Sequence, residues 1–115
     1  LAMGLANSET GIVTEPPQTV DGQWPYGQAR ADWLLLDVTQ AVGRIPFSFA
    51  WSGADFAILS AHKLGGPKGV GALSVREGVD ISALAVGGGQ EMGRRSGTEN
   101  IIGIAGCGAA AEAAE

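Results

Sequence analysis

The fold of this chain is decided by residues 56–71, which read FAILSAHKLGGPKGVG. The apolar run from Phe56 to Leu59 is short and ends at Ser60, which is typical of a buried strand. The polar residues through Lys63 follow directly, and clustered glycines come after them. Because ligands of α/β proteins bind outside the carboxyl ends of the strands, we expect this turn to belong to a ligand site.

The same arrangement of an apolar run followed by a polar residue occurs elsewhere in the chain. Residues 1–6 read as a buried strand that stops at Asn7, and residues 33–36 as a strand buried on both faces that ends at Asp37. Residues 69–75 read as a further strand. Short buried strands of this kind predict an α/β fold with a mostly parallel sheet.

The segments between these strands carry weaker signals. We expect residues 14–31 to form a loop with one short helical turn, and residues 38–42 to form a short helix closed by Gly43. We expect a helical turn or a short strand over residues 80–84, and an extended polar loop over residues 87–98. Glu99 or Asn100 can cap a final helix that begins near Ile101 and runs to the end.

Composition limits the classes of function. The chain has 115 residues, 45% of them hydrophobic, and a net charge of −5. There is no basic stripe to neutralise nucleic-acid phosphates, and no apolar run reaches the roughly 20 residues that span a bilayer. Cys107 is the single cysteine, so no internal disulfide can form, which favours a cytoplasmic protein. We expect residues 1–115 to be a fragment of one large domain, truncated at both ends.

Lys63 and Asp37 are the first candidates for chemistry. A lysine nucleophile needs apolar walls or cationic neighbours that keep its amine neutral, and glycines beside Lys63 would let the backbone approach a flat ligand. An isolated lysine in a glycine-rich turn is more often an ordinary surface residue. Asp37 ends a buried strand, where a carboxylate needs a cation or several donors. It could equally cap the turn over residues 38–42, and both roles are compatible.

The remaining motifs mainly rule out particular kinds of site. His62 is the single histidine; a lone histidine is usually structural, but its position next to Lys63 makes it a candidate catalytic residue as well. One histidine and one cysteine cannot supply the ligands of a zinc site. The glycines of residues 65–71 lack the Gly-Lys-Ser/Thr triplet of a phosphate-binding P-loop. Cys107, in a Gly/Ala-rich helix, reads as a packing residue.

Four segments, taken in order, resemble the cysteine desulfurases, a branch of the class V aminotransferases with the type I fold of pyridoxal phosphate (PLP) enzymes. The matching segments are LANSETG at residues 5–11, DVTQAVGRIP at 37–46, SAHKLGGPKGVG at 60–71, and GGGQE with RSGTEN at 87–91 and 95–100. The last segment favours the desulfurase branch. Residues 11–33 depart from the family pattern, because they are rich in Pro and Gly where the family has an amphipathic helix.

The resemblance implies a role for each matching residue. Lys63 would carry the cofactor and move protons on the substrate carbon, and Asp37 would hold the pyridine nitrogen protonated. Gln40 would hydrogen-bond the phenolic oxygen of the ring. The remaining roles are phosphate binding by Ser60 and His62, orientation of the substrate carboxylate by Asn7, and contact with the cofactor phosphate of a neighbouring subunit by Thr98.

The resemblance also implies the reaction. The whole protein would remove sulfur from L-cysteine, giving alanine and a persulfide on an enzyme cysteine, as a homodimer that delivers sulfur to an acceptor or scaffold protein, for example in iron–sulfur cluster assembly. The persulfide cysteine falls outside this segment, so we expect the fragment alone to be inactive. The alternatives are another class V enzyme, such as a selenocysteine lyase or an aminotransferase, and a non-catalytic relative that acts as a scaffold.

Overall fold

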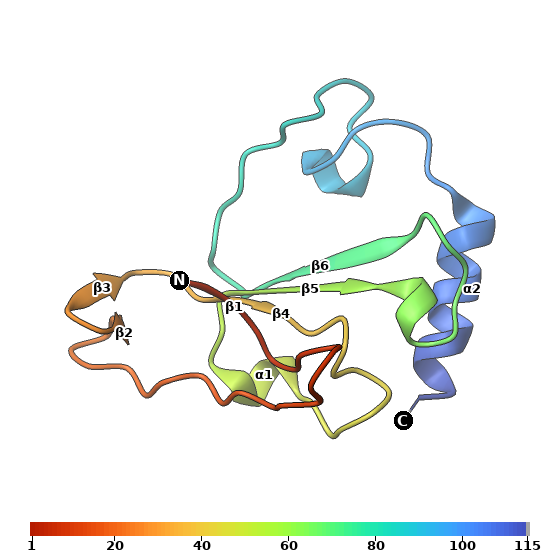
Figure 1. The fold of residues 1–115 in the computed structure, drawn as a ribbon. Coiled ribbons are helices and arrows are strands. Elements are labelled where there is room, and N and C mark those ends of the chain that lie inside the picture. Colours follow the sequence, from red (N-terminus) through yellow and green to blue (C-terminus); the bar gives the residue numbers. More distant parts are fainter. Residues whose placement is uncertain (115) are drawn as a thin grey trace.

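A computed structural model describes residues 1–114, and a four-stranded sheet forms its centre (Figure 1). The strands lie in the order β1 (Ala2–Gly4), β4 (Leu35–Asp37), β5 (Phe56–Ser60) and β6 (Gly71–Val75). The first three are parallel, and β6 returns antiparallel to β5. The mostly parallel α/β sheet expected from the sequence is thereby confirmed.

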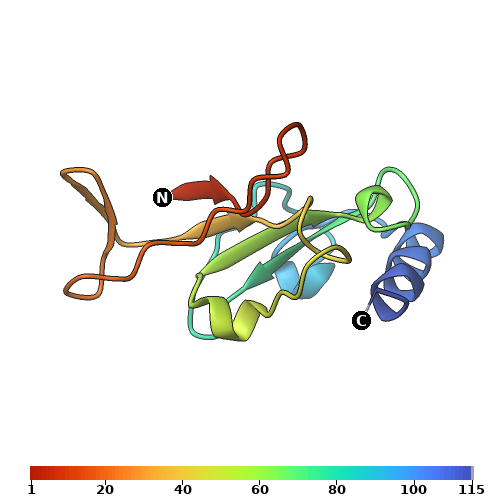
Figure 2. The same cartoon turned by 60° about the horizontal axis from the view of Figure 1, so that its bottom comes forward.

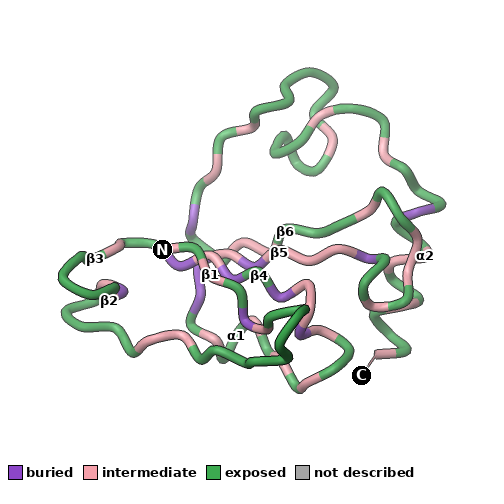
Figure 3. Tube along the Cα trace, viewed as in Figure 1, coloured by how far each residue is buried: buried purple, intermediate pink, exposed green. Residues whose placement is uncertain are grey.

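The core lies along β4 and β5 (Figure 3). Leu34 and Leu36 are fully buried, and Val38 just past the strand is 1% exposed. These alternate positions point to one face of a pleated strand, and Leu5, Trp24, Ala54 and Ala57 pack into the same cluster. The prediction that residues 1–6 form a buried strand was right about the strand and wrong about its burial, because only Leu5 is buried there.

Residues 14–31 contain a hairpin that the sequence did not indicate. Strands β2 (Trp24–Tyr26) and β3 (Ala29–Ala31) pair antiparallel, with Tyr26 opposite Ala29. Gly27 between them has a φ of +60°, which suits a two-residue hairpin turn. The expected helical turn is therefore wrong here. Trp24 is 7% exposed, so its indole anchors the hairpin to the core.

Two α-helices and two short 3₁₀ turns complete the fold. α1 (Phe49–Ser52) was not expected; its N-cap Ser48 accepts a hydrogen bond from the Trp51 amide. α2 (Ile101–Glu112) confirms the predicted final helix, and Asn100 Oδ1 accepts from the Gly103 amide at 3.1 Å. The 3₁₀ turns are η1 (Ala61–Lys63) and η2 (Glu91–Gly93). No described helix is long and apolar enough to cross a membrane.

Two other local predictions differ from the structure. Residues 38–42 form consecutive turns instead of a helix, although Gly43 closes them with a φ of +75°, as expected. Residues 80–84 form neither a helical turn nor a strand, and the long loop over residues 87–98 contains η2. No side chain in residues 80–84 or 87–98 is buried, so tertiary packing does not enforce a regular conformation on these two segments.

α2 packs beside η1 and the loop that follows it, at one end of the sheet (Figures 1 and 2). Glycines make the close approach possible. A Cβ placed on Gly106 would lie 3.1 Å from the Pro67 ring, and one on Gly66 would lie 3.4 Å from the Ala110 Cβ. The helix therefore supports the glycine-rich loop from behind.

Candidate functional site

The candidate site is built by the carboxyl ends of three parallel strands. Gly4, Asp37 and Ile58 are aligned across β1, β4 and β5. The Leu5 amide donates to the Asp37 carbonyl, and the Val38 amide to the Ile58 carbonyl, both at 3.0 Å. Neighbouring strands lie about 4.8 Å apart. The register thus brings the turns that follow all three strands to the same edge of the sheet.

Asp37 stands at the centre of this edge. Its Oδ1 accepts from the Thr39 amide at 2.9 Å, so the predicted capping of the following turn is confirmed. Val38 and Ala41, both buried, anchor that turn to the core. Before Asp37 only Leu34 and Leu36 are buried, whereas Trp33 is exposed, so the predicted burial of this strand on both faces is wrong. The Asp37 carboxylate is exposed as well, which removes the expected desolvation of the charge. Among the described residues, the structure gives Oδ2 no partner, and Gln40 lies half-buried in the same turn.

The turn that carries Lys63 is fixed through its buried neighbour Ala61. The Ala61 amide donates to the Val70 carbonyl at 3.0 Å, and its carbonyl accepts from the amides of Leu64 and Gly66. Ala61 has no exposed surface, whereas the next two residues of the turn, His62 and Lys63, are exposed. A well-anchored backbone therefore presents two basic side chains beyond the end of β5.

The loop that follows Lys63 leaves room on its outer side. Gly65 and Gly69 have φ values of +103° and +78°, and a Cβ on either would meet nothing within 4 Å. A left-handed backbone favours glycine, so the sequence cluster has a conformational reason. The half-buried Ser60 adds its hydroxyl at the start of the turn.

Sequence reasoning missed Arg44, which joins the two turns. Its Nη2 donates to the Lys63 carbonyl at 2.6 Å, across 19 residues of sequence. The motif at residues 37–46 contained this arginine, but nothing in the pattern says which carbonyl it reaches. The turns of Asp37 and Lys63 are thus in direct contact.

Asn7 and Thr98 are placed less centrally. Asn7 Oδ1 accepts from the amides of Glu9 and Thr10, at 2.9 and 3.0 Å, and from the Thr10 hydroxyl. This Asx-type turn shapes the loop after β1. Thr98 is exposed between η2 and α2, and no hydrogen bond within residues 1–114 joins it to the other candidates.

Sequence reasoning also missed a buried carboxylate at the opposite edge of the sheet. Asp55 precedes β5 and is 1% exposed. Its Oδ2 accepts from the Leu34 amide at 2.7 Å, and its Oδ1 pairs with Arg76 at 2.6 Å. The antiparallel register places Asp55 opposite Arg76, because Phe56 is aligned with Val75. This ion pair belongs to the fold and lies away from the candidate site.

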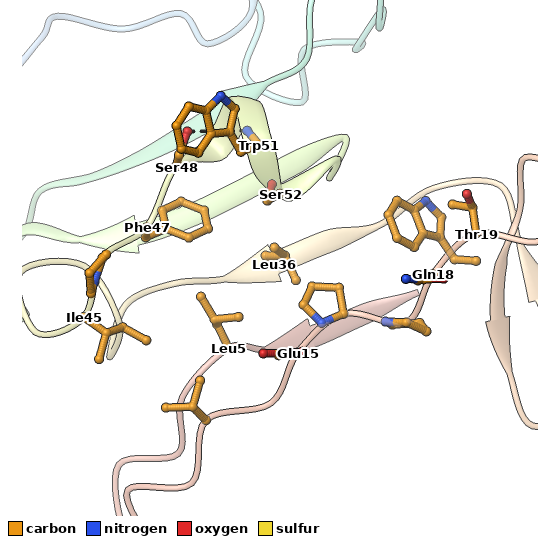
Figure 4. A pocket seen from close by; sticks show the side chains of 15 residues that line it. Leu5, Glu15, Gln18, Thr19, Leu36, Ile45, Phe47, Ser48, Trp51 and Ser52 are labelled. Atoms are coloured by element: carbon orange, nitrogen blue, oxygen red, sulfur yellow. Dashed lines mark hydrogen bonds between the residues drawn. The ribbon is translucent and has the colours of Figure 1, made fainter.

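A cavity of about 710 Å³ opens on another part of the molecule (Figure 4). Leu5 and Leu36 lie at its floor, with Phe47 and Trp51 on one side and residues 15–19 on the other. None of the candidate site residues lines it. It lies against the loop over residues 15–19, and Lys63 does not line it, so the cavity is no part of the candidate site.

The relation to known proteins follows from sequence and structure together. A family model described as Aminotransferase class-V matches residues 1–115. The chain belongs to the class V aminotransferase family. A cysteine desulfurase of Frankia sp. (strain EuIK1) is 47% identical over 116 residues, which cover 99% of this chain and 27% of that protein. The chain thus spans about a quarter of the length of such relatives.

Solved structures of this family match the fold. A NifS-like protein is 50% identical, with a TM-score of 0.69 over 71% of this chain and 22% of its own. SspA in complex with cysteine is 38% identical, with a TM-score of 0.64 over 69% of this chain and 23% of its own. DndA from Streptomyces lividans is 30% identical, with a TM-score of 0.75 over 98% of this chain and 32% of its own. The sheet described above is therefore part of the large-domain sheet of type I PLP enzymes.

Proposed function

We propose that this chain supplies the lysine-bearing part of a PLP-dependent cysteine desulfurase. The observation that carries the proposal is the meeting of the Asp37 and Lys63 turns at the carboxyl ends of adjacent parallel strands, with a direct contact between them. The names of the relatives favour this branch, and one structural neighbour is described in complex with cysteine. The reaction proposed for the whole protein converts L-cysteine into alanine and an enzyme persulfide.

The residues at this edge fit PLP by their chemistry. Asp37 offers an exposed carboxylate, one oxygen of which has no hydrogen-bond partner among the described residues. Ser60, His62 and Lys63 add a hydroxyl, an imidazole and an amine at the same edge of the sheet. A phosphate group binds best to hydroxyl and cationic donors together, and a pyridinium nitrogen pairs with a carboxylate. The open space outside Gly65 and Gly69 leaves room for a flat ring.

Each residue has a distinct task in the proposed site. When bound, PLP withdraws electrons from the α-carbon of the substrate and so weakens the bonds around that atom. Lys63 holds the cofactor covalently and moves a proton at the substrate α-carbon. Asp37 keeps a proton on the pyridine nitrogen, and Gln40 donates to the phenolic oxygen. Ser60 and His62 bind the phosphate, and Asn7 binds the substrate carboxylate.

The remaining parts of the proposal concern the whole protein. We assign Thr98 to the phosphate of the cofactor in a second subunit, which requires a homodimer. Cys107 lies half-buried in α2 and is not proposed as the persulfide cysteine, which we place outside residues 1–115. A sulfur-acceptor or scaffold protein, a cytoplasmic location and a role in iron–sulfur cluster assembly complete the proposal.

The test is borohydride reduction of the intact natural gene product supplied with PLP, followed by peptide mapping. We expect a phosphopyridoxyl group on Lys63, and none on the nearby exposed Lys68. Lys63→Ala should abolish covalent attachment and lower the turnover of L-cysteine by about a thousandfold or more, because both the cofactor link and the proton carrier are lost. Lys68→Ala is the matched control and should leave both properties unchanged.

The outcomes separate the candidate functions. Alanine formed from L-cysteine, with sulfide released from the enzyme persulfide by added dithiothreitol, supports the desulfurase. Labelled Lys63 without this reaction points to another class V activity, which selenocysteine and amino-group transfer would then test. A protein that takes up no PLP would favour the scaffold function. Label on Lys68 would overturn the residue assignments.

A further inference from the structure

Arg44 occupies a fixed position between the two turns of the proposed site. It follows Gly43, whose φ of +75° ends the run of turns after Asp37, and its amide donates to the Ala41 carbonyl at 3.0 Å. Ala41 is fully buried. The backbone of Arg44 is therefore held by the core, while its side chain reaches over the surface to the Lys63 carbonyl.

The Lys63 carbonyl accepts no hydrogen bond from its own turn among the described residues. The Leu64 and Gly66 amides both donate to the Ala61 carbonyl, and residue 67 is a proline without an N–H. The Arg44 guanidinium is the donor that the described structure gives to this carbonyl, at 2.6 Å. A hydrogen bond from a charged donor is stronger than a neutral one, and the planar guanidinium fixes its direction.

A packing contact next to this hydrogen bond keeps the two turns in register. A Cβ placed on Gly43 would lie 3.7 Å from the Leu64 Cβ and 3.3 Å from the Ala114 Cβ. Gly43 thus lies against Leu64 and Arg44 against Lys63, in opposite order along the two turns. Together with the pairing of β4 and β5, one polar contact and one packing contact hold the Lys63 turn against the Asp37 turn.

We propose that Arg44 is a positioning residue for Lys63. It holds the Lys63 backbone against the turn of Asp37 and Gln40, so that amine and carboxylate can engage opposite parts of one ring. The inference rests on the proposed function, since it concerns the geometry in which PLP is held. Arg44 itself lies exposed at the surface and touches a backbone carbonyl, so it acts through Lys63.

The experiment compares Arg44→Met, Arg44→Lys and Arg30→Met in the intact natural gene product. Arg30 is the matched control, because it is also exposed and donates to a backbone carbonyl, that of Ala29, on the distant β3. PLP is titrated into each apoprotein by absorbance. Hydrogen exchange of the peptide covering residues 61–70 is followed without PLP, and thermal unfolding of the apoproteins reports on the fold.

We expect Arg44→Met to weaken PLP binding about three- to tenfold, the effect of one charge-assisted hydrogen bond at the surface, and to speed exchange in residues 61–70 by a similar factor. Arg44→Lys keeps a cationic donor and should recover part of both losses. Arg30→Met should match the natural protein. The unfolding temperature should stay the same in all three variants.

The contrary results are distinguishable. If the natural protein carries PLP on Lys63 and Arg44→Met binds it equally well, the positioning role is wrong and the proposed function stands. A fall in PLP affinity accompanied by a lower unfolding temperature and faster exchange throughout would also overturn the inference, because it would show general destabilisation. If the natural protein takes up no PLP on Lys63, the proposed function fails and this inference fails with it.

Discussion

The two edges of the sheet each carry an aspartate, and these aspartates are used in opposite ways. At the amino end of β5, Asp55 is 1% exposed, and both of its oxygens are bound, to the Leu34 amide and to Arg76. At the carboxyl end of β4, Asp37 is exposed, and one oxygen accepts a single amide. A buried carboxylate needs all its partners from the protein, whereas an exposed one can keep capacity for a ligand.

This difference assigns the two edges to different tasks. At the Asp55 edge, one side chain connects β4, β5 and the end of β6, and it thereby stabilises the fold. The Asp37 edge collects exposed polar groups on anchored turns, which is the placement expected for a ligand site in an α/β sheet. Sequence position alone would not separate the two aspartates, since each stands next to a short apolar strand.

The largest expected effect comes from truncating the two aspartates in parallel. Asp55→Ala should lower the free energy of unfolding by about 3 kcal/mol, because it leaves the buried Leu34 amide without an acceptor and Arg76 without its partner. Asp37→Ala should cost less than about 1 kcal/mol, the loss of one exposed cap. Urea unfolding of the intact apoprotein measures both.

Cofactor uptake by the same two variants should show the reverse order. Asp37→Ala should bind PLP at least about tenfold more weakly, while folded Asp55→Ala should bind it normally. Equal losses of stability in the two variants would show that the two edges are not specialised. A Leu34→Ile variant, which keeps the backbone amide, is the control for mutation in this part of the core.

The next largest effect is expected for Gly71→Ala, which tests whether packing at the Asp37 edge also contributes to stability. Gly71 is aligned with Ser60, and a Cβ at this position would lie 2.6 Å from the Leu59 carbonyl oxygen. Gly71→Ala should therefore cost about 2 kcal/mol, as expected for overpacking against backbone, and should weaken PLP binding by moving Ser60. Both are measured as for the aspartates.

Ala72→Ser, one residue further along β6, is the control for Gly71→Ala. Its side chain is exposed, so the substitution should change stability by less than about 0.5 kcal/mol. If Gly71→Ala were equally harmless, the close pairing of β5 and β6 beside Ser60 would not constrain the site.

Much of the fold at the Asp37 edge could be predicted from the sequence. Apolar runs that end at Asp37 and Ser60 locate the strand ends, and parallel pairing then brings those ends together. Glu99 and Asn100 were both recognisable as candidate caps before an apolar run, and the structure selects Asn100. These features depend on local sequence, which a single chain displays directly.

What the sequence could not supply depends on pairing between distant residues. The partnership of Asp55 with Arg76 requires the register of β5 and β6, and that of Arg44 with Lys63 requires two turns to meet in space. The hairpin of β2 and β3 was missed because Pro and Gly normally indicate loops, while here the buried Trp24 fixes the segment to the core. The exposure of Asp37 was likewise invisible in a buried apolar run.

The smallest expected effect concerns the helix that supports the Lys63 loop. Replacing glycine by alanine inside a helix normally stabilises it by about 1 kcal/mol. At Gly108 a Cβ would meet nothing within 4 Å, so Gly108→Ala should show this gain. At Gly103 a Cβ would collide with Val70 Cγ2 and with the capping amide of Asn100, and overpacking costs about 1–3 kcal/mol. Gly103→Ala should therefore be neutral or destabilising by up to about 2 kcal/mol.

The sign of the difference between these two glycines decides whether α2 rests on the Lys63 loop or merely lies near it. Urea unfolding of both variants in the intact apoprotein gives the difference directly, and helix propensity cancels because the same exchange is made twice. A loss confined to Gly103→Ala would show that the start of α2 is tightly packed against Val70 and the Asn100 cap, and the Val70 carbonyl holds the Ala61 amide beside His62 and Lys63. Equal gains in both variants would mean that Val70 yields easily, and the anchoring of the Lys63 turn would then rest on β5, β6 and Arg44 without the helix.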